Sequence, residues 1–110
     1  MDATTREMTR GEVSIFICLE QAASVDGLFK EIAATAGGWV LKAIEKRFEA
    51  HGLTVDKKVM IFILTIGNGV VGQCAQHVDN MAEWAGKQQQ TQIDWRTFTH
   101  QIYPHGIPVF

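Results

Sequence analysis

The feature that most constrains this chain is a series of apolar residues at steps of three and four, the spacing of one face of an α-helix. A first series, in phase from residue 28 to residue 48, comprises Leu28, Phe29, Ile32, Ala36, Trp39, Val40, Ala43, Ile44 and Phe48. A second comprises Met60, Ile63, Leu64, Gly67, Val70, Val71, Cys74, Val78, Met81, Trp84 and Ala85. The spacing predicts two long central helices, over residues 26–51 and 57–86.

The second series contains an ambiguous segment, the apolar run of residues 59–66. Such a run fits a buried strand as well as a buried helix. The apolar phase, however, continues through Gly67, Asn68 and Gly69, and a strand followed by a loop has no reason to preserve it. We therefore predict a helix that continues through the glycines.

Two shorter helices are expected on either side of this pair. Thr9 and Glu12 have the S/T-x-x-E spacing of a capping box, which predicts a helix over residues 12–24, with a buried strand over residues 13–19 as the alternative. Thr91 and Asp94 repeat the spacing before a short fourth helix that Pro104 ends. The expected fold class is all-α, a four-helix up-and-down bundle in a single domain over residues 1–110.

The two ends of the chain are expected to be non-helical. Residues 1–8 are polar and form a flexible lead-in, and residues 104–110 form an extended tail because prolines and Gly106 interrupt them. Three apolar residues of this tail, Ile107, Val109 and Phe110, gain nothing from exposure to water. We therefore expect the tail to dock in a groove between helices, and these three residues to form an interaction site.

The length of the two central helices suggests self-association. At 1.5 Å per residue they would span roughly 38 and 45 Å, whereas a compact domain of this size is about 34 Å across. Either the helices bend or break, or a homo-oligomer covers an elongated hairpin. The glycines at 37–38 and 67–69 would lie at one height in such a hairpin. They favour a close helix contact at Gly38 and Gly69, with a break in both helices that leaves room for a ligand as the alternative.

Composition and charge argue against several classes of protein. The net charge is −2, and the ten Lys and Arg residues form no basic stripe, which disfavours nucleic-acid binding. Residues 59–75 are too short and too interrupted for a membrane span. Cys18 and Cys74 lie in apolar runs and are expected to be reduced and buried. The N-terminal segment lacks the pattern of an export signal, so we expect a cytoplasmic protein.

Residues 67–72 match G-x-G-x-x-G, the pattern of a dinucleotide-binding turn. The chain beyond it is too short and too polar for the expected parallel strand, so we interpret these glycines as part of a helix crossing. Cys74 and His77, with His100 and His105, do not have a recognisable zinc spacing. We expect no metal, no cofactor and no catalytic residue.

The sequence therefore predicts a small non-catalytic interaction or regulatory protein that self-associates and binds a protein partner. The alternative is a protein or enzyme that binds a small molecule or nucleotide in a pocket near residues 67–72. Its candidate ligand-binding residues are Trp39, Asn68, Gln73 and His77.

Overall fold

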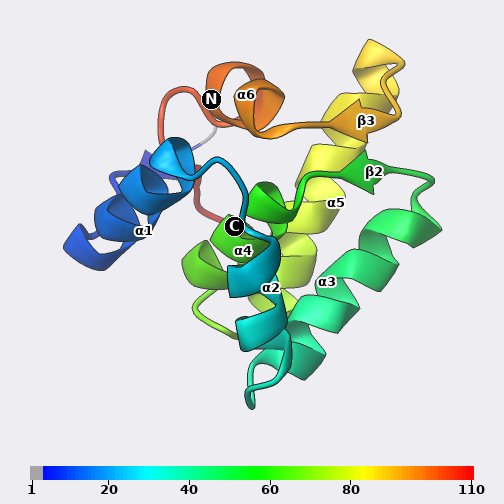
Figure 1. Ribbon diagram of the computed structural model, residues 1–110. Coiled ribbons are helices and arrows are strands. Elements are labelled where there is room, and N and C mark those ends of the chain that lie inside the picture. The colour runs from blue at the N-terminus through cyan, green and yellow to red at the C-terminus, as the bar shows by residue number, and fades with distance from the viewer. Residues whose placement is uncertain (1–3) are drawn as a thin grey trace.

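The computed structural model describes residues 4–110, which are mostly helical (Figure 1). The α-helices are α1 Arg10–Gln21, α2 Asp26–Ala33, α3 Gly38–Ala50, α4 Lys57–Ile66, α5 Val71–Gln88 and α6 Trp95–Thr97. A π-helix, η1 Phe98–Ile102, continues α6. Four short strands, β1 Thr5–Arg6, β2 Thr54–Val55, β3 Gln92–Ile93 and β4 Ile107–Pro108, complete the described elements. The predicted helical character is confirmed.

The prediction of two long central helices in a four-helix bundle is wrong in its main detail. The first is divided into α2 and α3 by residues 34–37, and the second into α4 and α5 by residues 67–70. The breaks let the chain fold back within one globule whose longest extent is 39 Å, with a radius of gyration of 13.1 Å. The helix-length argument for an elongated hairpin therefore no longer holds.

Although the long helices are broken, much of each apolar stripe still faces one core. Val40, Ile44 and Phe48 of α3 are buried, as are Val78 and Met81 of α5. The helix α4 is apolar on nearly all sides and packs against α1, α2, α3 and α5 (Figure 1). The ambiguous run of residues 59–66 is thus a buried helix, as predicted.

The turn between α4 and α5 explains why the chain breaks there. Asn68 and Gly69 both have positive φ, 55° and 68°, a conformation that Gly and Asn adopt at low cost. Their N–H groups close the end of α4 by donating to the carbonyls of Thr65 and Leu64, each at 3.0 Å. The expected contact of Gly38 with Gly69 is wrong, because a Cβ at Gly69 would meet nothing within 4 Å.

The two ends of the described chain pair with each other. Strands β1 and β4 are antiparallel, with Thr5 opposite Pro108 and Arg6 opposite Ile107. Thr5 and Arg6 were expected in a flexible lead-in and instead form a strand, whereas residues 1–3 of that lead-in lie outside the described residues. The tail is extended, as predicted. Ile107 is 3% exposed, but Val109 and Phe110 are 51% and 56% exposed.

A second pair of strands joins two loops that sequence patterning did not connect. β2 and β3 are parallel, with Thr54 opposite Gln92 and Val55 opposite Ile93. Val55 and Ile93 are buried. The pair fixes the start of α4 relative to the end of α5.

The first helix begins with the predicted capping box. The Glu12 N–H donates to the Thr9 hydroxyl at 3.2 Å, and the Thr9 N–H donates to the Glu12 carboxylate at 2.9 Å. The strand alternative for residues 13–19 is therefore excluded. Cys74 is buried as expected, but Cys18 faces solvent on α1, contrary to expectation. Within residues 4–110, none of the helices has the length and apolar character needed to cross a bilayer.

An ion-pair cluster links α3 to α5. Arg47 donates through Nε and Nη2 to the two carboxylate oxygens of Asp79, both at 2.8 Å, and His51 Nε2 lies 3.0 Å from Asp79 Oδ1. Hydrogen bonds from Arg47 and then His51 lower the pKa of Asp79 to about 2, although burial opposes them. Since all three side chains are partly exposed, solvent weakens the cluster.

We predict opposite effects for two glycine substitutions around the α4–α5 turn. A Cβ at Gly67 would press on the Cys74 side chain and lie 3.0 Å from its backbone nitrogen, whereas one at Gly72 would meet nothing within 4 Å. Gly67→Ala should destabilise the protein by about 1–3 kcal/mol. Gly72→Ala, in the first turn of α5, should stabilise it by up to about 1 kcal/mol through helix propensity. Urea unfolding measures both, and equal effects would contradict the described turn.

We also predict that Asp79→Asn lowers the free energy of unfolding at pH 7 by up to about 1 kcal/mol. Because the folded-state pKa lies below the ordinary value of 3.8, the contribution of Asp79 is present above pH 3.8 and is lost as the pH falls towards 2. The difference between wild type and variant in urea unfolding should shrink over that range. Glu83→Gln is the control, since Glu83 forms only an exposed i,i+4 pair with Lys87. An effect of Glu83→Gln as large as that of Asp79→Asn would contradict the prediction.

Candidate functional site

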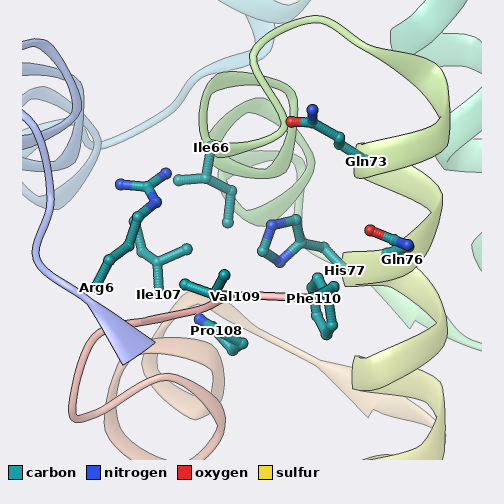
Figure 2. Close-up of a pocket in the computed structure, with 9 residues that line it drawn as sticks. All are labelled: Arg6, Ile66, Gln73, Gln76, His77, Ile107, Pro108, Val109 and Phe110. Atoms are coloured by element: carbon teal, nitrogen blue, oxygen red, sulfur yellow. The ribbon is translucent and has the colours of Figure 1, made fainter. Parts of the chain in front are cut away.

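A pocket of about 290 Å³ lies where the β1–β4 pair meets the end of α4 and the first half of α5 (Figure 2). Its lining residues are Arg6, Ile66, Gln73, Gln76, His77, Ile107, Pro108, Val109 and Phe110. Segments from both ends of the described chain and from its middle therefore build one site.

His77 is the central polar residue of this pocket. It projects from α5 and is only 4% exposed. Its Nδ1 lies 2.7 Å from the Tyr103 hydroxyl, and the Phe110 ring contacts its imidazole edge-on, with centroids 4.9 Å apart. Figure 2 shows the other ring nitrogen, Nε2, on the side of Ile66, away from Phe110.

The surroundings of His77 define its protonation state. Burial, and secondarily the positive charge of Arg6, lower the pKa of His77 to about 4, so the imidazole is neutral at pH 7. Burial also raises the pKa of Tyr103, which keeps its hydroxyl protonated. A neutral imidazole carries its proton on one ring nitrogen, and when the Tyr103 hydroxyl donates to Nδ1 that proton is on Nε2. In this tautomer His77 presents one N–H donor to the pocket.

Arg6 forms the opposite wall and is already paired. Its Nη1 and Nη2 donate to the two Glu12 carboxylate oxygens at 2.7 and 2.8 Å. The hydrogen bond from Arg6 is the main reason why the pKa of Glu12 is lowered. Since Glu12 also belongs to the capping box of α1, the guanidinium is held in place and its charge is largely balanced.

The structure brings together some of the residues predicted from sequence and separates others. Gln73 and His77 lie in this pocket with Ile107, Val109 and Phe110, which were expected to form a separate interaction site. Asn68 does not line it: the residue is exposed in the α4–α5 turn, where its positive φ explains the choice of Asn. Trp39 lies elsewhere, on α3.

Sequence reasoning missed four of the lining residues, Arg6, Ile66, Gln76 and Pro108. Arg6 reaches the pocket through the pairing of β1 with β4, and two-residue strands give no periodic signal. Ile66 was recognised as apolar, but its position at the pocket depends on α4 ending there. The signal available in the sequence was the Asn-Gly pair at 68–69, which is typical of a turn.

Trp39 lines a second concavity, a groove of about 390 Å³ between α2 and α3. The lining residues are Phe29, Ala33, Gly38, Trp39, Leu41, Lys42 and Glu45. The Trp39 side chain is 64% exposed, the largest exposed fraction among the large hydrophobic residues described. We call this concavity the α2–α3 groove.

The chemical alternatives raised by the sequence find little support in local geometry. The G-x-G-x-x-G segment follows the helix α4, whereas a dinucleotide-binding turn follows a strand. The Cys74 thiol is fully buried and lies 3.6 Å from the Ile63 carbonyl oxygen, and burial raises its pKa to about 11, which disfavours the nucleophilic thiolate. Among residues 4–110, no three His, Cys, Asp or Glu side chains gather as metal ligands.

Comparison with protein-family models, with curated proteins and with solved structures gives no match. The chemistry of the pocket at His77 and of the α2–α3 groove therefore has to indicate the function.

We predict that His77 makes stability depend on pH between about 6.5 and 4. Because the pKa of His77 in the folded state lies below the ordinary value of 6.5, the unfolded chain takes up a proton before the folded chain does as the pH falls. The contribution of neutral His77 to the free energy of unfolding is therefore complete above pH 6.5 and is lost as the pH falls to about 4. The lowered pKa of His77 corresponds to about 3 kcal/mol of the free energy of unfolding. His77→Gln, which leaves a side-chain acceptor for Tyr103, should remove this part of the pH dependence in urea unfolding.

The control is His100→Gln, which replaces an exposed histidine of η1. This variant should retain the pH dependence that His77 confers, because it leaves His77 in place. If His77→Gln does the same, the buried neutral histidine is contradicted.

Proposed function

We propose that this protein is a non-catalytic interaction protein that binds an amphipathic helix of a partner protein in the α2–α3 groove. The observation that carries the proposal is the exposed indole of Trp39 beside an apolar groove. Tryptophan is enriched among the residues that dominate binding energy in protein interfaces. Leaving an indole in water on a helix surface contributes nothing to folding.

The shape of the groove supports a helical occupant. α2 and α3 meet at the turn of residues 34–37 and diverge from it in Figure 1. Small residues, Ala33 and Gly38, lie beside the turn, and Phe29 and Trp39 provide larger apolar surfaces. A groove between two helices with apolar walls suits the apolar face of a third helix, whose anchors recur at i, i+3, i+4 and i+7.

The charges of the groove define the partner further. Lys42 and Glu45 line it from α3, one cation and one anion less than a turn apart. A partner helix with both signs of charge flanking its apolar face would satisfy them. A strongly basic or strongly acidic partner would be repelled by one of the two.

Self-association remains a proposal on different grounds from the original one. Much of the stripe of residues 60–85 that was expected to form a dimer contact is buried within the chain, including Met60, Ile63, Val78 and Met81. A dimer would therefore need exposed apolar surface, and Trp39 has the largest exposed fraction among the large hydrophobic residues described. The cytoplasmic location expected from the sequence is likewise a proposal.

We predict that Trp39→Ala weakens binding of a selected helical peptide about tenfold or more, as expected for an interface anchor. Peptides are selected against the whole chain from a display library of amphipathic helices, and their binding is measured by titration calorimetry. Ile17→Ala is the matched control, because Ile17 is an exposed apolar residue of α1 outside the groove.

Amide chemical shift changes should map to α2 and α3. Peptides that bind Trp39→Ala as tightly as wild type would overturn the groove as the site. Light scattering provides the second readout. A mass of twice 12.2 kDa that Trp39→Ala returns to 12.2 kDa would assign the groove to a second copy of this chain, and would overturn the partner helix.

A further inference from the structure

We infer that the pocket at His77 binds a small uncharged ring compound that carries an amide group. In this arrangement the amide carbonyl oxygen accepts a hydrogen bond from His77 Nε2, and the amide N–H donates to the side chain of Gln73. The inference does not depend on the α2–α3 groove, because the two sites share no lining residue.

His77 Nε2 is the polar atom at the centre of the inferred binding site. Nδ1 is occupied by the Tyr103 hydroxyl, and no side chain or backbone group of residues 4–110 accepts a hydrogen bond from Nε2. His77 as a whole is 4% exposed, but Nε2 is not fully buried, because none of the fully buried side-chain nitrogens and oxygens described lacks a partner. Since His77 lines the pocket, a ligand there can replace the water at Nε2 with an acceptor of its own.

The charges of the lining residues restrict the ligand. Arg6 is the one fully charged side chain that lines the pocket, and both of its Nη atoms are committed to Glu12. A carboxylate or phosphate that entered the pocket would lose its hydration. In return it would contact only a neutral imidazole and the guanidinium of Arg6, whose charge Glu12 already balances, so its binding would be unfavourable. An ammonium would face the same guanidinium and an N–H donor. An uncharged acceptor fits the site best.

The shape of the pocket restricts the ligand further. Ile66 and Ile107 are buried and form an apolar wall, and the Phe110 ring closes another side, next to the imidazole (Figure 2). A volume of about 290 Å³ is at the small end of ligand pockets, which favours a compound of a single ring. A planar ring can contact Phe110 edge-on or offset, as aromatic pairs prefer.

Gln73 supplies the second polar contact with the inferred ligand. Gln73 and Gln76 project from successive turns on one side of α5 and are exposed, so each can turn either its carbonyl or its NH2 towards the pocket (Figure 2). An amide offers an acceptor and a donor side by side, which matches one histidine N–H and one glutamine carbonyl. The pocket therefore selects amides over ketones and ethers.

The test is a titration of the whole chain with benzamide, with benzoate and benzylamine as charged analogues of the same size. Nuclear magnetic resonance follows the imidazole signals of His77 and the backbone amides of residues 73–77 and 107–110. We expect benzamide to shift the His77 signals in a saturable way. Benzoate and benzylamine should bind about tenfold more weakly or worse, because burying their charge without a partner is costly.

Two variants connect the binding to the assigned atoms. His77→Phe keeps an aromatic ring but removes the N–H donor, and His100→Phe is the matched control on the exposed face of η1. Loss of a buried hydrogen bond should weaken benzamide about tenfold in the first and not at all in the second. Because His77→Phe also leaves the Tyr103 hydroxyl without its acceptor, Gln73→Ala provides a second, exposed substitution that should weaken benzamide without affecting folding.

Three outcomes overturn the inference. One is that benzamide leaves the His77 signals unchanged at millimolar concentration. Another is that it binds the His77→Phe and Gln73→Ala variants as tightly as the wild type. The third is that benzoate binds more tightly than benzamide, which would make the pocket an anion site. None of these results affects the peptide binding at Trp39, so the two proposals fail separately.

Discussion

The burial of α4 is the constraint on which the rest of the structure depends. Its residues Val59, Met60, Ile61, Phe62, Ile63 and Ile66 are all nearly inaccessible. A helix that is apolar all round has to be covered on every side. Two long antiparallel helices and two short ones would leave much of such a helix uncovered at this chain length. Breaking the long helices allows α1, α2, α3 and α5 to surround it, and the breaks at residues 34–37 and 67–70 follow from that requirement.

This constraint explains which parts of the fold were predictable from sequence. Helical periodicity identified many buried positions, such as Val40 on α3 and Met81 on α5, because a core position within a helix stays one whether or not the helix continues beyond it. It failed beside the breaks, where Trp39, Val70 and Val71 are exposed. It could not identify the breaks. An apolar phase that continues across a turn imitates one helix, and it outweighed the local evidence of Asn68 and Gly69, whose positive φ ends α4. Turn chemistry was the stronger signal in this case.

The candidate pocket was predictable only in part, for a related reason. His77 and Gln73 were singled out because they are polar residues close to the apolar stripe of α5. Arg6 was not singled out, because only the pairing of strands β1 and β4 brings it to the pocket. In that pairing Arg6 lies opposite Ile107, which is 101 positions away in the sequence. Long-range pairing of two-residue strands leaves no periodic trace in sequence, and the parallel pairing of β2 with β3 was missed for the same reason. Trp39 was grouped with Asn68 because an unbroken hairpin would bring the glycines at 37–38 and 67–69 to one height.

Both candidate sites lie next to a break in a long apolar pattern. Gly38 begins α3 beside the α2–α3 groove, and Ile66 ends α4 beside the pocket. A break leaves apolar side chains that no longer have a neighbour on their own helix, and these become the walls of a concavity. The pocket differs from the groove in being lined by a buried polar residue, His77, which is hydrogen-bonded to the partly buried Tyr103. An apolar pair of similar size would serve packing equally well, because a satisfied buried hydrogen bond contributes only about 1 kcal/mol net. Stability alone therefore does not account for His77, whereas the inferred hydrogen bond from Nε2 to a ligand would.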